Sequence, residues 1–298
     1  MREMTCWGTV RRHGSGAGPT AEVSWFRQKK CLLRKTAVLN LSGFQKKIKI
    51  NGDEPFIPHM KGSIILSMNS ELYQRRMRQF IEDVTLYPVS CECLAHGRSD
   101  EQWLDSVLAG GAKIVQLRDK HSSDRRLLEK ARYFRRRTAE AGVLFLVNDR
   151  FDIALLAGAD GLHLGQNDLP PDEIRRLAPD LIIGQSCNTE AQARRLGQQE
   201  QRGELVLSYY NIGPIYPTGT KEGLVEFIGP QAIGAYSRHC SLPFTVMGGI
   251  KYHHIGELVR SGARRIAVVT AITEAEDMAA ETARWVGRIT TVLEECDG

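Results

Sequence analysis

Residues 141–168, AGVLFLVNDRFDIALLAGADGLHLGQND, contain the repeated pattern that decides the fold. Two short apolar runs, Val143–Val147 and Gly161–Leu164, each follow an Ala-Gly step, Ala141-Gly142 before the first and Ala157-Gly158 before the second. Glycine just past a helix adopts the left-handed conformation that caps it, and a β-type run follows directly. The stretch therefore predicts two consecutive units in which a helix is followed by a buried strand.

The same alternation extends over residues 84–298. The apolar runs that we interpret as strands are Thr85–Val89, Lys113–Leu117, Val143–Val147, Gly161–Leu164, Leu181–Gly184, Val206–Ile212, Phe244–Met247 and Arg265–Val269. Helical patterns include Asn69–Glu82 before the first run and then Arg125–Ala141, Asp172–Leu177, Glu190–Gln201 and Asp277–Leu293. About eight such units match the size of a (β/α)₈ TIM barrel. An open doubly wound sheet is the alternative, but the repeat count favours a closed barrel, and no G-x-G-x-x-G motif follows the first run.

Residues 1–67 differ from the rest of the chain in charge and pattern. They carry 12 Lys and Arg against 4 Asp and Glu, whereas residues 68–298 carry 28 against 31. A Gly-rich stretch at 14–19 and the lack of a sustained period predict low order in this segment. We interpret it as an upstream extension with Met68 opening the folded part, the alternative being a basic arm or targeting peptide. Residues 68–298 are predicted to form the catalytic barrel.

The bulk composition excludes several classes of protein. No apolar run approaches the roughly 18–20 residues that a bilayer span needs, so no membrane partner is expected. The seven cysteines include no C-x-x-C pair, which argues against a disulfide framework or a zinc site and favours a reducing cytoplasm. The foldable part is slightly acidic, so it gives no indication of nucleic-acid binding.

Charged residues follow three neighbouring strands of the predicted barrel, where reactive groups of this fold lie. Arg118 and Lys120 alternate after the second run and should point to the same side, as a phosphate site requires. Asp149 follows the third run and Asp168 the fourth, so the two carboxylates could share Mg²⁺ with phosphate oxygens. Each aspartate alone would more often cap a helix, but their coincidence with the two cations favours a metal site.

The loops after the later strands predict a second anion site. The sixth run leads into GPIYPTGTKEG (213–223), whose hydroxyls, lysine and glycines suit a loop that closes over anionic oxygens. The seventh and eighth runs end in MGGI (247–250) and VTA (269–271), where backbone N–H groups of a barrel usually bind phosphate. His163 is interpreted as a packing residue and Cys187 as a bystander, because neither is accompanied by a catalytic partner in the sequence.

These pieces, in this order, resemble the thiamine-phosphate synthase family. The matching stretches are QLRDK (116–120), VNDR (147–150), DGLHLGQND (160–168), IIGQS (182–186), NIGPIYPTGTKEG (211–223), VMGGI (246–250) and AVVTAI (267–272). Members of that family are barrels that couple an aminopyrimidine methyl diphosphate to a thiazole phosphate, releasing pyrophosphate and leaving thiamine monophosphate. The resemblance therefore implies a transferase with these two small-molecule substrates and Mg²⁺ as cofactor.

Carried over position by position, the resemblance implies a role for each matching residue. The pyrimidine diphosphate would be bound by Gln116, Arg118, Lys120, Asn148 and Lys221. The thiazole phosphate would be bound by Thr218, Thr220, Gly249, Val269 and Thr270. Asp149 and Asp168 would hold Mg²⁺ against the diphosphate, and Ser186 would lie near the reacting centre. Arg118, Lys120, Ser186 and Lys221 would be the catalytic residues.

The chain departs from the family pattern at two positions and in its long basic extension, residues 1–67. Asn188 stands where the family often has a histidine, and Asp119 where it more usually has glutamate. Thiazole tautomerase-like proteins, the nearest relatives, use a histidine at the Asn188 position and typically lack the two aspartates. The remaining alternatives are another sugar-phosphate barrel, such as a phosphoribosyl isomerase, and a non-catalytic protein that binds thiamine precursors.

Overall fold

The computed structural model describes residues 36–41, 44–49, 70–218 and 227–298. The chain divides into two units, Met1–His59 and Met60–Gly298. In the first unit, β1 (Thr36–Leu41) pairs antiparallel with β2 (Phe44–Lys49). Low order is predicted from the sequence for residues 1–67. Apart from β1 and β2, these residues lie outside the described part of the chain.

The second unit is a closed parallel barrel, as the sequence predicts. Its strands are β3 (Leu86–Pro88), β4 (Ile114–Leu117), β5 (Leu144–Asn148), β6 (Gly161–Leu164), β7 (Ile182–Cys187), β8 (Tyr209–Ile212), β9 (Phe244–Val246) and β10 (Ile266–Val268). They are hydrogen-bonded in the order β3-β10-β9-β8-β7-β6-β5-β4. A parallel bridge between Val89 and Gln116 joins the two ends of this order and closes the ring.

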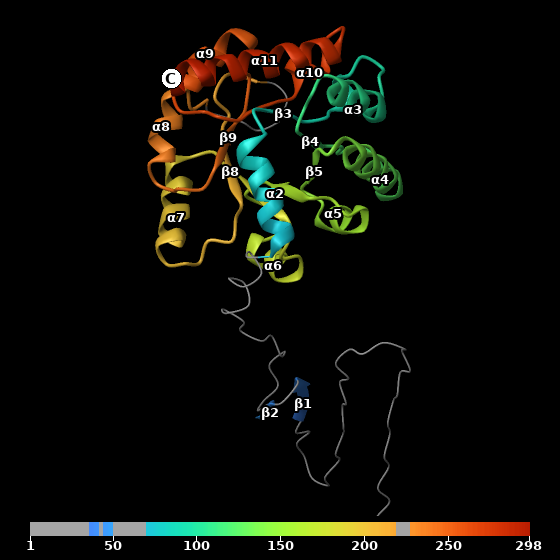
Figure 1. The fold of residues 1–298 in the computed structure, drawn as a ribbon, viewed down its shortest axis with the longest axis vertical. Helices are drawn as coiled ribbons and strands as arrows, with labels where there is room; N and C mark the ends of the chain where they lie inside the picture. The colour runs from blue at the N-terminus through green and yellow to red at the C-terminus, as the bar shows by residue number, and fades with distance from the viewer. Residues whose placement is uncertain (1–35, 42–43, 50–69, 219–226) are drawn as a thin grey trace, which may run out of the picture. The chain divides into compact units, whose positions relative to one another are not determined.

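Helices on the outside of the ring follow the successive strands (Figure 1). They are α3 (Asp100–Ala109), α4 (Asp124–Ala141), α5 (Phe151–Ala157), α6 (Pro171–Leu177), α7 (Glu190–Gln201), α8 (Gln231–Ser237), α9 (Ile255–Arg260) and α11 (Met278–Asp297). Three short helices lie in the loops: η1 (Glu92–Leu94), η2 (Tyr252–His254) and α10 (Thr270–Thr273). The alternation of strand and helix places every βα loop at one end of the barrel, which is where reactive groups of this fold gather.

The predicted element boundaries are mostly close to the observed ones, but β7 ends three residues later than predicted and β8 begins three residues later. The strand predicted over Val206–Ile212 begins only at Tyr209. The guanidinium of buried Arg175 donates from Nε and Nη2 to the carbonyl oxygen of Val206, at 3.1 and 3.0 Å. Because this carbonyl is taken by a side chain, the backbone there does not join the sheet ladder.

A helix before the barrel, α2 (Glu71–Glu82), closes the end at which the strands begin. It starts after Ser70, whose hydroxyl accepts a hydrogen bond from the backbone of Tyr73. Its buried side chains Tyr73, Met77 and Phe80 pack into the cluster that fills the barrel interior. Figure 1 shows α2 lying across the ring of strands. Burying an aromatic or aliphatic side chain stabilises the folded state by about 1.5–3 kcal/mol, so these three side chains hold α2 firmly against this end of the barrel and close it as a plug.

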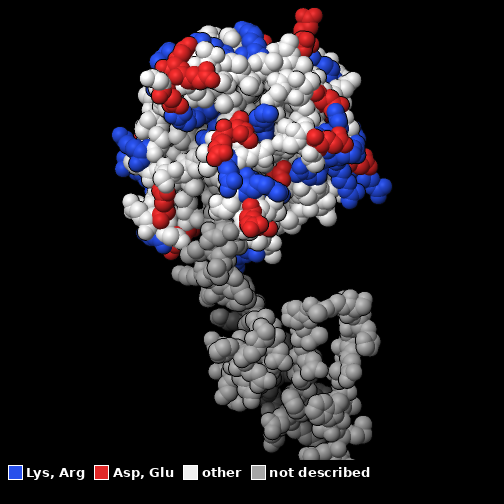
Figure 2. All heavy atoms as spheres, viewed as in Figure 1, with Lys and Arg blue, Asp and Glu red and all other residues white. Residues whose placement is uncertain are grey.

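Charges of both signs are interspersed on the face of the barrel shown in Figure 2. Ion pairs among the described residues include Arg126 with Glu101 and Arg137 with Asp105. This face therefore presents no broad region of a single sign. Within the described residues, no helix has the length and apolar character that crossing a bilayer requires.

Candidate active site

A pocket opens where the strands end, and it brings together most of the residues predicted from the sequence. It encloses about 980 Å³, open solvent at its mouth included. The predicted residues that line it are Gln116, Arg118, Lys120, Asn148, Asp149, Ser186, Thr218, Gly249, Val269 and Thr270. The predicted residues Thr220 and Lys221 lie outside the described part of the chain. One cavity thus joins the two anion sites that the sequence predicts.

Two cations follow β4 at the rim of this pocket. The backbone N–H of Arg118 donates to the hydroxyl of Ser90 at 3.1 Å, which anchors the end of the strand. The guanidinium of Arg118 contacts the Cys91 thiol, with 3.8 Å between Nη1 and Sγ. Lys120 is half-exposed, and its ammonium lies 3.3 Å from a carboxylate oxygen of Asp149. Lys120 thus reaches the first of the two predicted metal ligands, whereas the Arg118 side chain contacts the loop after β3.

The carboxylates of Asp149 and Asp168 lie side by side. Asp149 has φ of 60°, a left-handed conformation that a non-glycine residue adopts mainly where the surrounding structure imposes it. Burial, and then the charge of Asp168, raise the pKa of Asp149, while Lys120 lowers it in part. The backbone N–H of Gly165 donates to Asp168 Oδ2 and fixes the second carboxylate.

This pair of carboxylates fits a divalent cation. The charge of Asp168 raises the pKa of Asp149, and a dication between the two carboxylates would offset their repulsion. Carboxylate oxygens are also ligands that Mg²⁺ prefers. Mg²⁺ keeps several coordination positions for water or phosphate oxygens, so two protein ligands at a pocket rim are sufficient. Asp149 and Asp168 are therefore the residues that could hold the metal.

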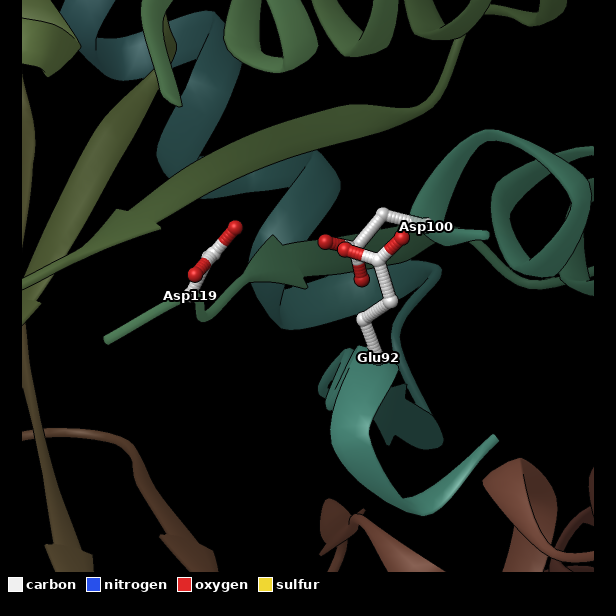
Figure 3. A group of neighbouring side chains, drawn as sticks. All are labelled: Glu92, Asp100 and Asp119. Atoms are coloured by element: carbon white, nitrogen blue, oxygen red, sulfur yellow. The ribbon is translucent and has the colours of Figure 1, made fainter. Parts of the chain in front are cut away.

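A second acidic cluster lies beside the pocket, and it is filled by a protein cation. Glu92 on η1, Asp100 at the start of α3 and Asp119 after β4 turn their carboxylates toward a common space (Figure 3). The buried ammonium of Lys130 on α4 lies 2.9 Å from Asp100 and 2.6 Å from Asp119, and it also contacts Glu92. Since Lys130 occupies the position that an ion would take, this cluster is a buried salt-bridge network.

The network supports the loop that carries the two rim cations. Asp119 accepts hydrogen bonds from the backbone N–H groups of His121 and Ser122, both at 2.9 Å, in addition to the one from Lys130. Burial alone would raise the pKa of Asp119, but the hydrogen bonds from Lys130 and Ser122 hold it far below its ordinary value. The carboxylate therefore stays charged and ties the turn after Arg118 to α4.

Glycines allow the backbone after β9 to approach the neighbouring loop closely. Gly248 and Gly249 have φ of 108° and 62°, which disfavours any residue with a side chain. A Cβ on Gly249 would lie 2.3 Å from the carbonyl oxygen of Pro217, so a side chain has no room there. Thr270 lines the same pocket at the start of α10. Backbone at this edge can thus contact a ligand directly, as the predicted monophosphate site requires.

The pocket also contains side chains that were not predicted as site residues, among them His163 and Asn188. His163, interpreted from the sequence as a packing residue, lines the pocket, and its Nε2 lies 3.1 Å from the Ser186 hydroxyl. Asn188 lines the pocket too and donates from Nδ2 to the Gly213 carbonyl at 2.6 Å. A polar residue near the carboxyl end of a strand was the available signal for His163. Cys187 is buried, and burial raises its pKa to about 12, which agrees with its interpretation as a bystander.

Comparisons with known proteins agree on one family. The model of the family described as thiamine monophosphate synthase matches residues 86–272. A thiamine-phosphate synthase of Haloquadratum walsbyi is 41% identical over 212 residues, which cover 70% of this chain and 92% of the relative. Another, of Shouchella clausii, is 39% identical over 196 residues, covering 65% and 91%. The solved structure of thiamine phosphate pyrophosphorylase from Pyrococcus furiosus is similar with a TM-score of 0.61 and 29% identity, covering 72% of this chain and 98% of that one.

Proposed function

The chain belongs to the thiamine monophosphate synthase family, and we propose that it couples hydroxymethylpyrimidine diphosphate to a thiazole phosphate, releasing pyrophosphate and forming thiamine monophosphate. It is therefore an enzyme, and the proposed reaction makes it a transferase. The observation that carries the proposal is the single pocket in which Arg118, Lys120 and Asp149 meet Gly249 and Thr270. Such a pocket could hold a diphosphate and a monophosphate within reach of each other.

The diphosphate would be bound at the cationic side. Arg118 and Lys120 supply positive charge, Gln116 and Asn148 supply amide groups, and Lys221 would complete the set from the loop after β8. Arginine suits phosphate oxygens because its planar guanidinium can donate two parallel hydrogen bonds. These groups stabilise negative charge that grows on the leaving pyrophosphate, which lowers the barrier to its departure.

Asp149 and Asp168 would hold Mg²⁺ beside the diphosphate. When bound, the ion would neutralise charge on the leaving group as a Lewis acid. The neighbouring carboxylates, with burial and mutual charge that raise the pKa of Asp149, support this assignment.

The thiazole phosphate would be bound by Thr218, Thr220, Gly249, Val269 and Thr270. In the proposed reaction the C–O bond of the pyrimidine methyl diphosphate breaks, and its electron pair leaves with pyrophosphate. The lone pair of the thiazole nitrogen then forms the new C–N bond. This chemistry needs leaving-group stabilisation and positioning more than a protein base, which agrees with a site rich in cations. Ser186 would lie near the reacting carbon.

The proposed partners are these two small molecules, with no nucleic acid or membrane required. The five cysteines in the described part of the chain are free thiols, which supports a reducing location such as the cytoplasm.

A coupled assay on the full-length chain tests the proposal. The protein would be incubated with both precursors and Mg²⁺, and release of pyrophosphate and formation of thiamine monophosphate would be measured together. We expect both products in equal amounts, and neither when one precursor or the metal is withheld. Binding of the precursors without pyrophosphate release would instead identify a non-catalytic binding protein. Conversion of a sugar phosphate alone would identify an isomerase.

A further inference from the structure

A continuous chain of hydrogen bonds crosses the barrel beneath the pocket. The amide Nε2 of Gln116 donates to the Tyr87 hydroxyl at 2.8 Å, and that hydroxyl lies 3.3 Å from the hydroxyl of Tyr209. The Tyr209 hydroxyl lies 2.9 Å from Nδ1 of His163, whose Nε2 lies 3.1 Å from the Ser186 hydroxyl. This series of hydrogen bonds thus joins β4, β3, β8, β6 and β7. The residues at its two ends, Gln116 and Ser186, both line the pocket.

Burial keeps the two tyrosines in the neutral form. Tyr87 and Tyr209 are 1% and 0% exposed, and Tyr209 packs against Phe80 of α2 with ring centroids 4.8 Å apart. Desolvation by burial raises the pKa of both phenols well above the ordinary value. Each hydroxyl therefore has one hydrogen to donate, and water does not compete for it.

The Gln116 amide, as the first donor, is consistent with one direction along this series of hydrogen bonds. Tyr87 accepts from the amide, and in this direction its own hydrogen points to Tyr209. The Tyr209 hydrogen then points to Nδ1 of His163, which requires the neutral imidazole to carry its hydrogen on Nε2. In this direction the Nε2–H donates to the Ser186 oxygen, and the Ser186 hydrogen points into the pocket.

We propose that Tyr87, Tyr209 and His163 are positioning residues that present the Ser186 hydroxyl as a hydrogen-bond donor to the pyrimidine substrate. This proposal rests on the proposed function, because the group that it assigns to Ser186 as a hydrogen-bond partner belongs to the pyrimidine substrate of that reaction. Within the pyrimidine ring, the atom that fits a donor is a nitrogen with a free lone pair. If the hydrogen bonds ran in the opposite direction, the Ser186 oxygen would accept a hydrogen bond from the substrate, and an exocyclic amino group would fit instead.

The first test compares two neighbouring tyrosines of β8. Tyr209→Phe removes the donor to His163, whereas Tyr210→Phe removes a buried hydroxyl that has no hydrogen-bond partner among the described residues. Losing one hydrogen bond in the binding geometry should raise the KM for the pyrimidine diphosphate roughly 10-fold in Tyr209→Phe. The KM for the thiazole phosphate should not change, and Tyr210→Phe should leave both values unaltered. Equal KM values for the pyrimidine diphosphate in wild type and Tyr209→Phe would overturn the proposal.

The second test observes the histidine tautomer and does not depend on catalysis. The full-length chain would be labelled with ¹⁵N-histidine at roughly pH 8, where an ordinary imidazole is neutral, and the His163 signals identified by their loss in His163→Gln. We expect a protonated Nε2 and an unprotonated Nδ1, with a mixture of tautomers in Tyr209→Phe. A protonated Nδ1 in the wild type would refute the proposed direction. If this tautomer is found but no thiamine monophosphate is made, the proposed function fails while the hydrogen-bond chain stands.

Discussion

Replacing Lys130 with Met should lower the free energy of unfolding by about 3–5 kcal/mol at pH 7. The side chain is 1% exposed, and two of its three carboxylate partners, Asp100 and Asp119, are 0% and 5% exposed. Methionine fills much of the volume of the lysine stem, so the loss comes from charge more than from packing. Removing one partner of a buried ion pair leaves the other charge uncompensated, and this sets the magnitude. Glu92 is 40% exposed and should add little.

The loss should depend on pH in a defined direction. In the wild type Lys130 lowers the pKa of Asp119 after folding, so its stabilisation is present above the ordinary pKa of about 3.9 and is lost as the pH falls below it. Burial already raises the pKa of Asp100 in the wild type, although Lys130 opposes it. In Lys130→Met burial should raise the pKa of Asp119 and raise that of Asp100 further, and protonation of the two carboxylates would remove the uncompensated charge. The difference between wild type and variant should therefore be largest near neutral pH and shrink below roughly pH 5.

Urea unfolding followed by circular dichroism at two pH values measures this difference. Arg137→Met is the matched control, because Arg137 lies on the same helix, is 39% exposed and pairs with Asp105 and Glu140. The control should change stability by about 1 kcal/mol or less. A loss under about 1 kcal/mol in Lys130→Met, or one that does not vary with pH, would refute the reasoning. Mg²⁺ bound at Asp149 and Asp168 should stabilise both proteins, so a larger Mg²⁺-dependent stabilisation in the variant than in the wild type would show that the acidic cluster takes up a metal.

Three further changes test the pocket and its support. Asp149→Asn should reduce turnover by orders of magnitude and weaken Mg²⁺ binding in calorimetry. In the wild type, Mg²⁺ affinity should fall as the pH falls. The reason is that the pKa of Asp149 is raised, so its protonation competes with the metal. Arg118→Met should weaken binding of inorganic pyrophosphate in calorimetry by roughly 10-fold or more without altering the thermal midpoint, since a charge-assisted hydrogen bond is lost at the pocket rim. Gly184→Ala should lower stability by about 1–3 kcal/mol in urea unfolding, because its Cβ would lie 2.1 Å from the Tyr209 ring. The control Gly287→Ala, on a helix with open space around it, should be neutral or stabilising, and an equal loss in both variants would contradict the steric argument.

The fold and the rim of the site follow from local sequence. Strand and helix alternate with glycine caps, and Arg118, Lys120 and Asp149 stand directly after strands, so the barrel topology alone brings them to one end. Their positions could therefore be predicted without knowledge of any long-range contact.

The supporting networks could not be predicted in this way. Tyr87 and Tyr209 are 122 residues apart, and their contact exists only once β3 and β8 face each other across the barrel. Lys130 lies on an amphipathic helix rich in Arg, where a lysine is expected to face solvent. Its burial depends on carboxylates from η1, α3 and the turn after β4, which no local pattern connects to it.

The plug formed by α2 has a consequence for the order of events in catalysis. With the start of the strands sealed by Tyr73, Met77 and Phe80, the described barrel offers substrates and products a shared entrance at the opposite end. Gln116 is 2% exposed, so a ring that contacts it lies deeper than a ligand at the loops. If the pyrimidine ring contacts Gln116, we expect the pyrimidine diphosphate to bind before the thiazole phosphate, and the joined product to leave after the pyrophosphate that shares its exit.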